Sequence, residues 1–209
     1  MADLIGRGVP VLTHANGDAA IDMMIDGVAA AIQGDVTPDH CSVIIHAQLM
    51  RDDQLDRVQA LGIVPSYFSA HAFFWGDWHR KSFGEKRAAF ISPLRATVER
   101  GIPFTIHNDA PVVPPDVMRL IWIAANRKTR SGFVLGPDQR ATVMQALYAV
   151  TLGAAFQYFA EDRKGSIAPE KQADLVILGA NPLTADADSL KDILIIETIA
   201  RGRTVFHSK

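Results

Sequence analysis

The chain has 209 residues, of which 48% are hydrophobic and 21% are charged, and its formal net charge is −2. These values fit one ordinary globular domain with or without a small appendage, and the charge argues against nucleic acid or an acidic membrane surface as a partner. No segment approaches the roughly 18 consecutive apolar residues of a membrane span, and the N-terminus lacks the pattern of a signal peptide. The single cysteine, Cys41, excludes an internal disulfide and favours a reducing, cytoplasmic compartment.

Four short apolar runs alternate with segments whose apolar residues have helical spacing. The runs predict β-strands over residues 9–13, 42–45, 63–67 and 102–106. The other segments predict helices over residues 19–32, 52–61, 85–100, 115–126 and 142–159. Strands that are apolar throughout and alternate with helices are typical of parallel sheets buried on both faces. The pattern therefore predicts an α/β fold.

The tail of the chain has a different character. Short β-rich runs at residues 174–178 and 203–207 lie among turns. We therefore expect residues 1–164 to form the α/β part and residues 165–209 to form a small β layer packed against it.

Three of the four predicted strands end in residues that commonly bind metals. His14 and His46 directly follow two of the apolar runs, and Asp109 follows the fourth run after His107 and Asn108. Neutral imidazole and carboxylate groups are ligands for Zn²⁺ and similar divalent ions. Each residue alone also has a structural explanation, as a hydrogen-bonded histidine or as a turn aspartate. Because the carboxyl ends of parallel strands meet in one crevice, the joint pattern favours a metal site.

Two further stretches contain candidate substrate-binding residues. Residues 68–84 predict a long loop in which His71 and Trp75 are candidates for a substrate wall, although such aromatic residues can equally cover the core. Arg127 and Arg130 could bind an anionic substrate through bidentate contacts, or they could belong to a solvated helix end.

Five stretches together resemble the amidohydrolase superfamily. They are THANGDAAID, IIHAQ, HNDAPVVPP, NRKTRSG and KGSIAPEKQADLVILGANPL. The likeness runs through nearly the whole chain and is to the metal-dependent hydrolase branch that includes N-substituted formamide deformylase and proteins named exoenzyme regulatory protein. It implies the later half of a (β/α)8 TIM-like barrel, strands five to eight, followed by the C-terminal portion of a β-sandwich.

The resemblance also implies roles for the residues at the strand ends. His14 and His46 match metal ligands at the fifth and sixth strands, and Asp109 matches the eighth-strand ligand, which also serves as general base on the attacking water. The implied cofactor is a divalent metal, with Zn²⁺ as the first candidate. The implied reaction is hydrolysis of a non-peptide, amide-type C–N bond in a small molecule.

Two parts of the family's metal site have no counterpart in this sequence. No two histidines stand two residues apart, as the family's first-strand His-x-His motif requires, and no residue matches the fourth-strand ligand. The resemblance therefore implies a C-terminal fragment with an incomplete site, inactive by itself. A different hypothesis is a non-catalytic half-barrel that covers its open strand edges by forming a homo-oligomer or by binding a missing N-terminal half.

Overall fold

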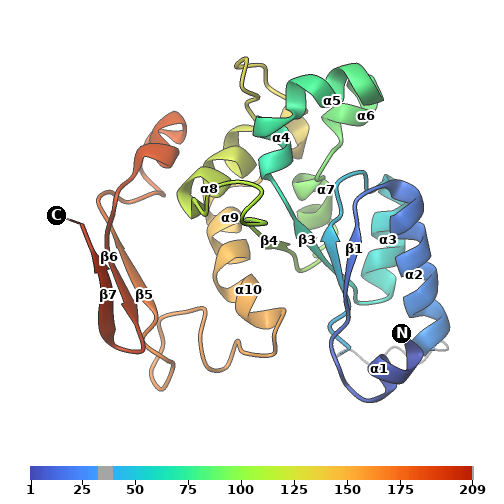
Figure 1. Cartoon of the computed structure of the whole chain (residues 1–209), viewed down its shortest axis with the longest axis horizontal. Helices are drawn as coiled ribbons and strands as arrows, with labels where there is room; N and C mark the ends of the chain where they lie inside the picture. The colour runs from blue at the N-terminus through green and yellow to red at the C-terminus, as the bar shows by residue number, and fades with distance from the viewer. Residues whose placement is uncertain (33–39, 209) are drawn as a thin grey trace.

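A four-stranded parallel sheet forms the centre of the protein. The computed structural model describes residues 1–32 and 40–208 (Figure 1). The sheet has the order β1-β2-β3-β4, so strands that are consecutive in the chain are neighbours in the sheet. The strands are β1 (Leu12–Ala15), β2 (Val43–His46), β3 (Val64–Tyr67) and β4 (Thr105–Ile106). All three pairings are parallel, which confirms the predicted α/β fold.

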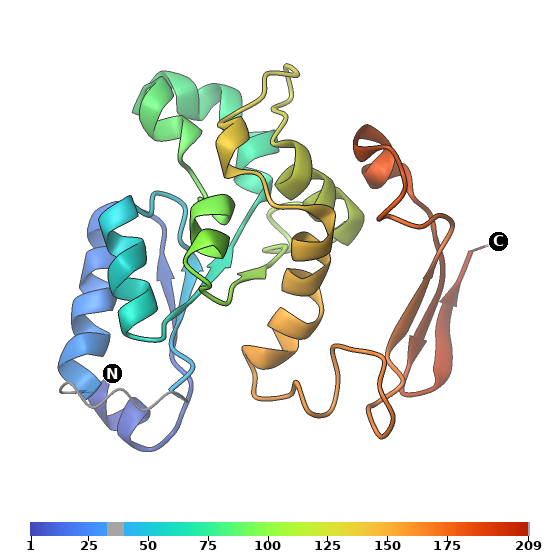
Figure 2. The same cartoon turned by 180° about the vertical axis from the view of Figure 1, so that it is seen from behind.

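Helices precede and follow the strands (Figures 1 and 2). The helices that the sequence predicted are α2 (Asp18–Ile32), α3 (Asp52–Ala60) and α8 (Val117–Asn126), with the last segment divided at Thr151 into α9 (Val143–Val150) and α10 (Leu152–Phe156). A short helix, α1 (Ala2–Gly6), and a 3-10 turn, η1 (Pro137–Gln139), were not predicted. No helix in the described ranges is long and apolar enough to cross a membrane.

Residues 68–84 differ most from expectation, because they form two helices rather than a loop. These helices are α4 (Ala70–Phe74) and α5 (Gly76–Phe83). Ring-bearing residues recur every three or four positions through this stretch, at Phe68, His71, Trp75, His79 and Phe83. Several of these rings contact one another, with centroids 4.7 Å apart for Phe68 and His71 and 5.0 Å apart for His79 and Phe83. A spacing of three or four residues is typical of one face of a helix, so it could have predicted helical structure here instead of a loop.

The single helix predicted over residues 85–100 is divided in two. The chain forms α6 (Glu85–Ala89) and α7 (Leu94–Glu99), separated by a turn in which Ser92 adopts a positive φ of 45° and Pro93 precedes α7. Proline cannot donate the backbone hydrogen bond that a continuous helix needs at this position. It also disfavours helical geometry at the residue before it, so the helix stops and restarts.

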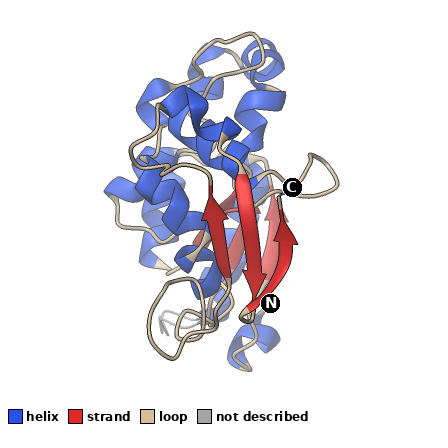
Figure 3. Ribbon diagram, turned by 90° about the vertical axis from the view of Figure 1, so that its left-hand side faces the viewer, coloured by secondary structure: helices blue, strands red, loops and turns tan. Residues whose placement is uncertain are grey.

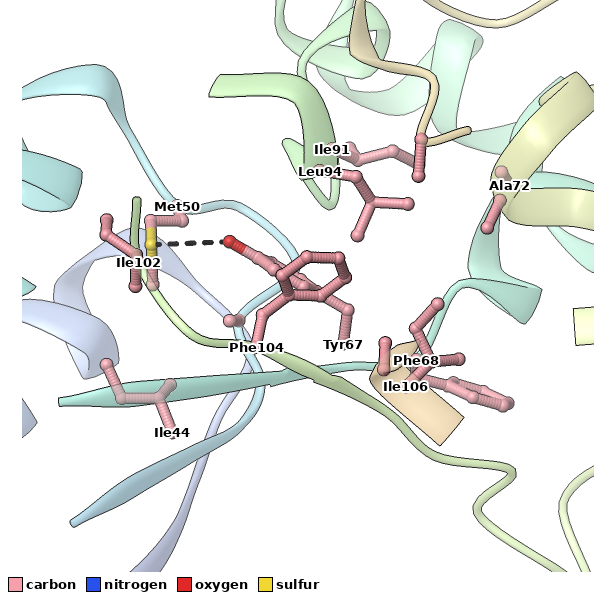
Figure 4. Close-up of a cluster of buried hydrophobic side chains, with 14 of the residues drawn as sticks. Ile44, Met50, Tyr67, Phe68, Ala72, Ile91, Leu94, Ile102, Phe104 and Ile106 are labelled. Carbon is pink, nitrogen blue, oxygen red and sulfur yellow. Dashed lines mark hydrogen bonds between the residues drawn. The ribbon is translucent and has the colours of Figure 1, made fainter. Parts of the chain in front are cut away.

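The hydrophobic core includes side chains of the parallel strands and of the helices around them, and it contains the fully buried Tyr67 (Figure 4). The Tyr67 hydroxyl forms a hydrogen bond of 2.7 Å with Thr97 Oγ1 and lies 3.9 Å from Met50 Sδ. Burial raises the pKa of this phenol. Because the hydroxyl has a partner, the ring contributes its apolar area without leaving an unpaired polar group.

The C-terminal residues form a second, antiparallel sheet with the order β5-β6-β7. Its strands are β5 (Leu175–Leu178), β6 (Ile195–Ala200) and β7 (Arg203–His207). Figure 3 looks onto this sheet, and no described helix covers the face toward the viewer. Val205 and Phe206 are 64% and 51% exposed.

The β layer contacts the α/β part through a small number of residues. The 3-10 segment η2 (Ala187–Asp192) provides much of this contact, since Leu190 is fully buried and the Ala187 carbonyl accepts a 2.8 Å hydrogen bond from Asn126 Nδ2 in α8. Lys128 forms a 2.6 Å ion pair with Asp188. Much of the β layer therefore remains exposed, and the division between residues 164 and 165 stays a prediction.

Candidate metal centre

Three potential metal ligands meet at the carboxyl ends of the parallel strands. β2 ends at His46, and His107 and Asp109 follow β4 within three residues. One ligand atom from each of His46, His107 and Asp109 lies within 4.8 Å of the other two. Two imidazoles and one carboxylate match the donor set that Zn²⁺ and related ions accept, so the residues present fit a divalent metal.

His14 lies beside this cluster without belonging to it. The ring centroids of His14 and His46 are 4.6 Å apart and the rings meet edge to face. The parallel register explains this closeness, because Ala15 pairs with His46 and His14 with Ile45. The structure thus brings His14, His46 and Asp109 to one edge of the sheet, and their assignment as ligands stays a prediction.

His107 is the site residue that the sequence analysis left outside the metal set. A hydrogen-bonded chain fixes its ring: Nδ1 lies 2.9 Å from Ser66 Oγ, and Thr105 Oγ1 donates to that hydroxyl at 2.7 Å. The other ring nitrogen, Nε2, lies 3.1 Å from His46 Nδ1. The signal was its position two residues before Asp109, since alternate strand residues face the same side. Such partners orient an imidazole for metal binding.

Burial keeps the histidines of the cluster neutral. It lowers the pKa of His107 to about 4, an effect that the positive form of His46 reinforces and the Asp109 carboxylate opposes. The pKa of His46 is also lowered, first by burial, while Asp109 raises it and His14 lowers it. At neutral pH each ring therefore keeps one unprotonated nitrogen, and the neutral form is the one that binds a metal.

Backbone conformation at the strand tips is unusual. His46, Ala47 and Asp109 have positive φ angles of 75°, 49° and 57°. Side-chain-bearing residues adopt this left-handed region at a cost of about 1–2 kcal/mol, and such residues cluster at functional sites. Two of the three cluster residues therefore owe their direction to backbone geometry that the surrounding structure must hold in place.

His71 and Trp75, the two predicted substrate-wall residues, lie in and directly after α4. The His71 ring centroid is 5.8 Å from that of His46, and Trp75 lies 5.8 Å beyond His71. His71 therefore adjoins the cluster, with Trp75 behind it. The Nδ1 atom of His71 is buried and has no hydrogen-bond partner among the described residues. Burial lowers the pKa of His71 to about 3, with further lowering from His46, His79 and His107.

The prediction that Arg127 binds substrate is wrong. The side chain is buried, and its guanidinium donates hydrogen bonds of 2.7–3.3 Å to backbone carbonyls in two separate loops. The acceptors are the carbonyl oxygens of Leu135, Ser92, Ala89 and Ile91. The planar fork of arginine suits this clamp. Burial, with a smaller effect of Arg140, lowers the pKa of Arg127 to about 10, so the group stays charged and fully engaged.

Comparison with known proteins identifies the family. The sequence matches the Amidohydrolase family over residues 2–206. The chain belongs to this family. It is 26% identical over 196 residues to N-substituted formamide deformylase of Arthrobacter pascens, covering 93% of this chain and 36% of that protein. It is 31% identical over 178 residues to Protein LONG AFTER FAR-RED 3 of Arabidopsis thaliana, covering 83% of this chain and 30% of that protein.

Solved structures confirm the architecture. An uncharacterised metal-dependent hydrolase from Pyrococcus furiosus is similar with a TM-score of 0.72 and 29% sequence identity, over 88% of this chain and 37% of that one. An amidohydrolase from Thermotoga maritima is similar with a TM-score of 0.69 at 18% identity, which shows the fold alone. The amidohydrolase chain therefore has a partial barrel, and it spans about a third of the length of the curated relatives that it matches.

Replacing Arg127 tests whether it is a structural clamp. We expect Arg127→Gln to lower the free energy of unfolding by about 3 kcal/mol, because it leaves buried carbonyls unpaired. The matched control is Arg95→Gln, which removes an exposed arginine paired with Glu99 on α7 and should cost less than about 1 kcal/mol. Urea unfolding followed by circular dichroism measures both. Equal midpoints for the two variants would contradict the clamp.

The buried neutral His71 predicts acid sensitivity of the metal-free protein. Its folded pKa lies below the ordinary unfolded value of about 6.5, so the unfolded state binds the proton more readily and stability is lost as pH falls from about 6.5 toward 3. Between pH 7 and pH 5 this group should account for about 2 kcal/mol of lost stability. In urea unfolding with chelator present, His71→Gln should remove much of that difference, and the exposed His207→Gln should not. A His71 variant with the full pH dependence would refute this assignment.

Proposed function

We propose that the chain carries part of the active centre of a metal-dependent hydrolase that cleaves a non-peptide, amide-type C–N bond. The observation that carries the proposal is the meeting of His46, His107 and Asp109 at the carboxyl edge of the parallel sheet. Family membership supports hydrolysis, and the name of one relative, N-substituted formamide deformylase, supports an amide-type substrate. We propose a small molecule as the substrate, because its C–N bond must reach the carboxyl ends of the parallel strands.

Zn²⁺ is the metal that we propose for this centre. His46 and Asp109 would hold it together with His14 or His107, because imidazole nitrogen and carboxylate oxygen are typical zinc ligands. When bound, a divalent ion supplies Lewis acidity, which polarises a carbonyl and lowers the pKa of water to about 7. The neutral imidazoles of His46 and His107 close to the Asp109 carboxylate support such a site.

The protein's own residues provide the remaining chemistry. Asp109 is the proposed general base, whose carboxylate takes the proton of the attacking water and returns it to the leaving amine. His107 is held by Ser66 and thereby keeps the neighbouring His46 ring in position. His71 and Trp75 close one side of the cluster and reduce access of water to it.

We propose that the centre is incomplete in this chain. The sequence contains no His-x-His pair, and the chain covers 36% of the formamide deformylase and 37% of the Pyrococcus furiosus hydrolase. We therefore expect the isolated chain to bind metal weakly and to lack hydrolase activity without the ligands that another segment or chain would supply.

Metal binding tests the proposed centre directly. We expect the metal-free chain to bind one Zn²⁺ weakly at neutral pH, which a titration against a low-affinity chromophoric indicator can detect. Asp109→Asn and His46→Ala should each weaken binding by about tenfold or more, because each removes a proposed ligand. His207→Ala, which removes an exposed histidine of β7, is the control. Equal Zn²⁺ affinity in all four proteins, or no binding in any, would exclude the centre.

Self-association is a second candidate property, favoured by the open edges of the parallel sheet. Among the described residues, β1 pairs only with β2, and β4 pairs only with β3. Leu12 on β1 is 41% exposed, and His14 on the same face is exposed as well. Unpaired edges and exposed apolar side chains invite pairing with another chain.

Light scattering tests this property. We expect a homo-oligomer at micromolar concentration and a shift toward monomer in Leu12→Lys, because an edge lysine opposes strand pairing. The control is Met23→Lys on the surface of α2, where the methionine is 76% exposed. A monodisperse monomer in the unmodified protein would rule out self-association.

A further inference from the structure

We propose that a pocket beside the Asp109 loop binds the carboxylate end of an organic anion with an apolar body, and that Arg130 recognises the anion. This inference rests on the proposed function, because it names the substrate class of the same site: an amide that also carries a carboxylate. The pocket has a volume of about 370 Å³, within the range of small-molecule sites.

The position of the pocket connects it to the metal centre. Its wall includes Asn108, which stands between His107 and Asp109 in the chain, and Phe73 and Phe74, which follow His71 in α4. The Asn108 side chain donates a 2.8 Å hydrogen bond to the Pro114 carbonyl, which fixes the loop that follows Asp109. A ligand in the pocket therefore lies against the same loop that carries the proposed general base.

The two arginines of the pocket differ in how much of their charge is already matched. Arg119 Nε lies 3.0 Å from the Asp116 carboxylate, which also caps α8 by accepting a hydrogen bond from the Arg119 backbone. Arg130 forms no ion pair with any carboxylate in the described ranges. The pocket lining thus holds two positive charges and one negative charge, and the unmatched positive charge is that of Arg130.

Arg130 is also positioned in a way that leaves its donors available. Its Cζ lies 5.4 Å from the centroid of the Phe74 ring. A guanidinium that contacts a ring in this way keeps N–H groups free for a planar anion, and a carboxylate matches two of them at once. Phe73 and Phe74 supply apolar and aromatic surface beside the charge. The pocket therefore suits a carboxylate joined to an apolar or aromatic body.

A larger pocket, of about 630 Å³, lacks these features. It lies between the loop after β2 and the start of α6, where Arg87 is paired with Asp18 at 2.8 Å and Arg51 is paired with Asp22 and Asp53. Its lining includes no residue of the Asp109 loop. The lining of the larger pocket balances three basic residues (Arg51, Lys86 and Arg87) with three acidic ones (Asp18, Asp52 and Glu85), although Lys86 forms no ion pair in the described ranges. The lining of the smaller pocket has a net positive charge and adjoins the Asp109 loop, so it is the one whose chemistry specifies an anion.

The test compares two ligands that differ only in charge. Phenylacetate and phenylacetamide are titrated into the metal-free full chain with chelator present, at low ionic strength, and binding is followed by ligand-observed NMR. We expect phenylacetate to bind about tenfold more tightly than phenylacetamide, because only the carboxylate can pair with Arg130. Equal affinity of the two ligands, or binding of neither, would overturn the proposal.

Three variants locate the interaction. Arg130→Gln should weaken phenylacetate binding by about tenfold and leave phenylacetamide binding unaffected, whereas Arg130→Lys should restore part of the difference because it keeps the charge. Arg95→Gln removes an exposed arginine elsewhere and should change neither affinity. Unchanged phenylacetate affinity in Arg130→Gln would assign the anion to another site.

The outcome separates this proposal from the proposed function. Phenylacetate binding without any Zn²⁺ binding would support the anion pocket and exclude the metal centre. Zn²⁺ binding that depends on His46 and Asp109, without charge-dependent binding of phenylacetate, would support the metal centre and overturn the anionic substrate class.

Discussion

The parallel pairing of four short strands determines where every polar group of the centre lies. Ala15 pairs with His46, His46 with Tyr67, and Tyr67 with Ile106, so the residues that end the strands arrive at one edge. Side chains alternate between the two faces of a strand, and a slip of one residue would turn a ligand into the opposite layer. The apolar runs that fix this register are therefore as necessary to the candidate centre as its proposed ligands are.

The sequence was informative where a local pattern and the fold agree, and misleading where a tertiary contact decides. The apolar runs ending at His14 and His46 correctly predicted parallel strands with polar tips, because burial on both faces leaves a periodic signal. Arg127 was predicted to bind substrate, with a solvated helix end as the alternative, because a basic stretch in the sequence does not show whether an arginine is buried. Only the distant carbonyls that it binds show its structural use, and no spacing in the sequence reveals them.

Several buried polar groups in this fold have hydrogen-bond partners, and these partners hold side chains of the candidate centre in place. The Tyr67 hydroxyl is matched by Thr97, and the His107 ring by Ser66 and His46. A buried hydrogen-bonded network tolerates few alternative arrangements, because breaking one contact exposes the full desolvation cost of the group left behind. The same network extends into β4, because Thr105 Oγ1 contacts both Ser66 Oγ and Gln157 Oε1. The hydrogen bonds that hold the His107 ring therefore also connect β3 to β4 next to the candidate centre.

The charges around the strand ends also constrain which molecule can bind there. In the metal-free protein, Asp109 places a carboxylate beside neutral imidazoles, so a second carboxylate close to it would be repelled there. An anionic substrate therefore gains most when its carboxylate contacts Arg130, whose charge no described carboxylate neutralises. With the carboxylate held by Arg130, the uncharged part of such a substrate, which includes its amide, is left to face Asp109. In the metal-free protein, electrostatics would then favour the orientation in which the C–N bond faces the proposed general base.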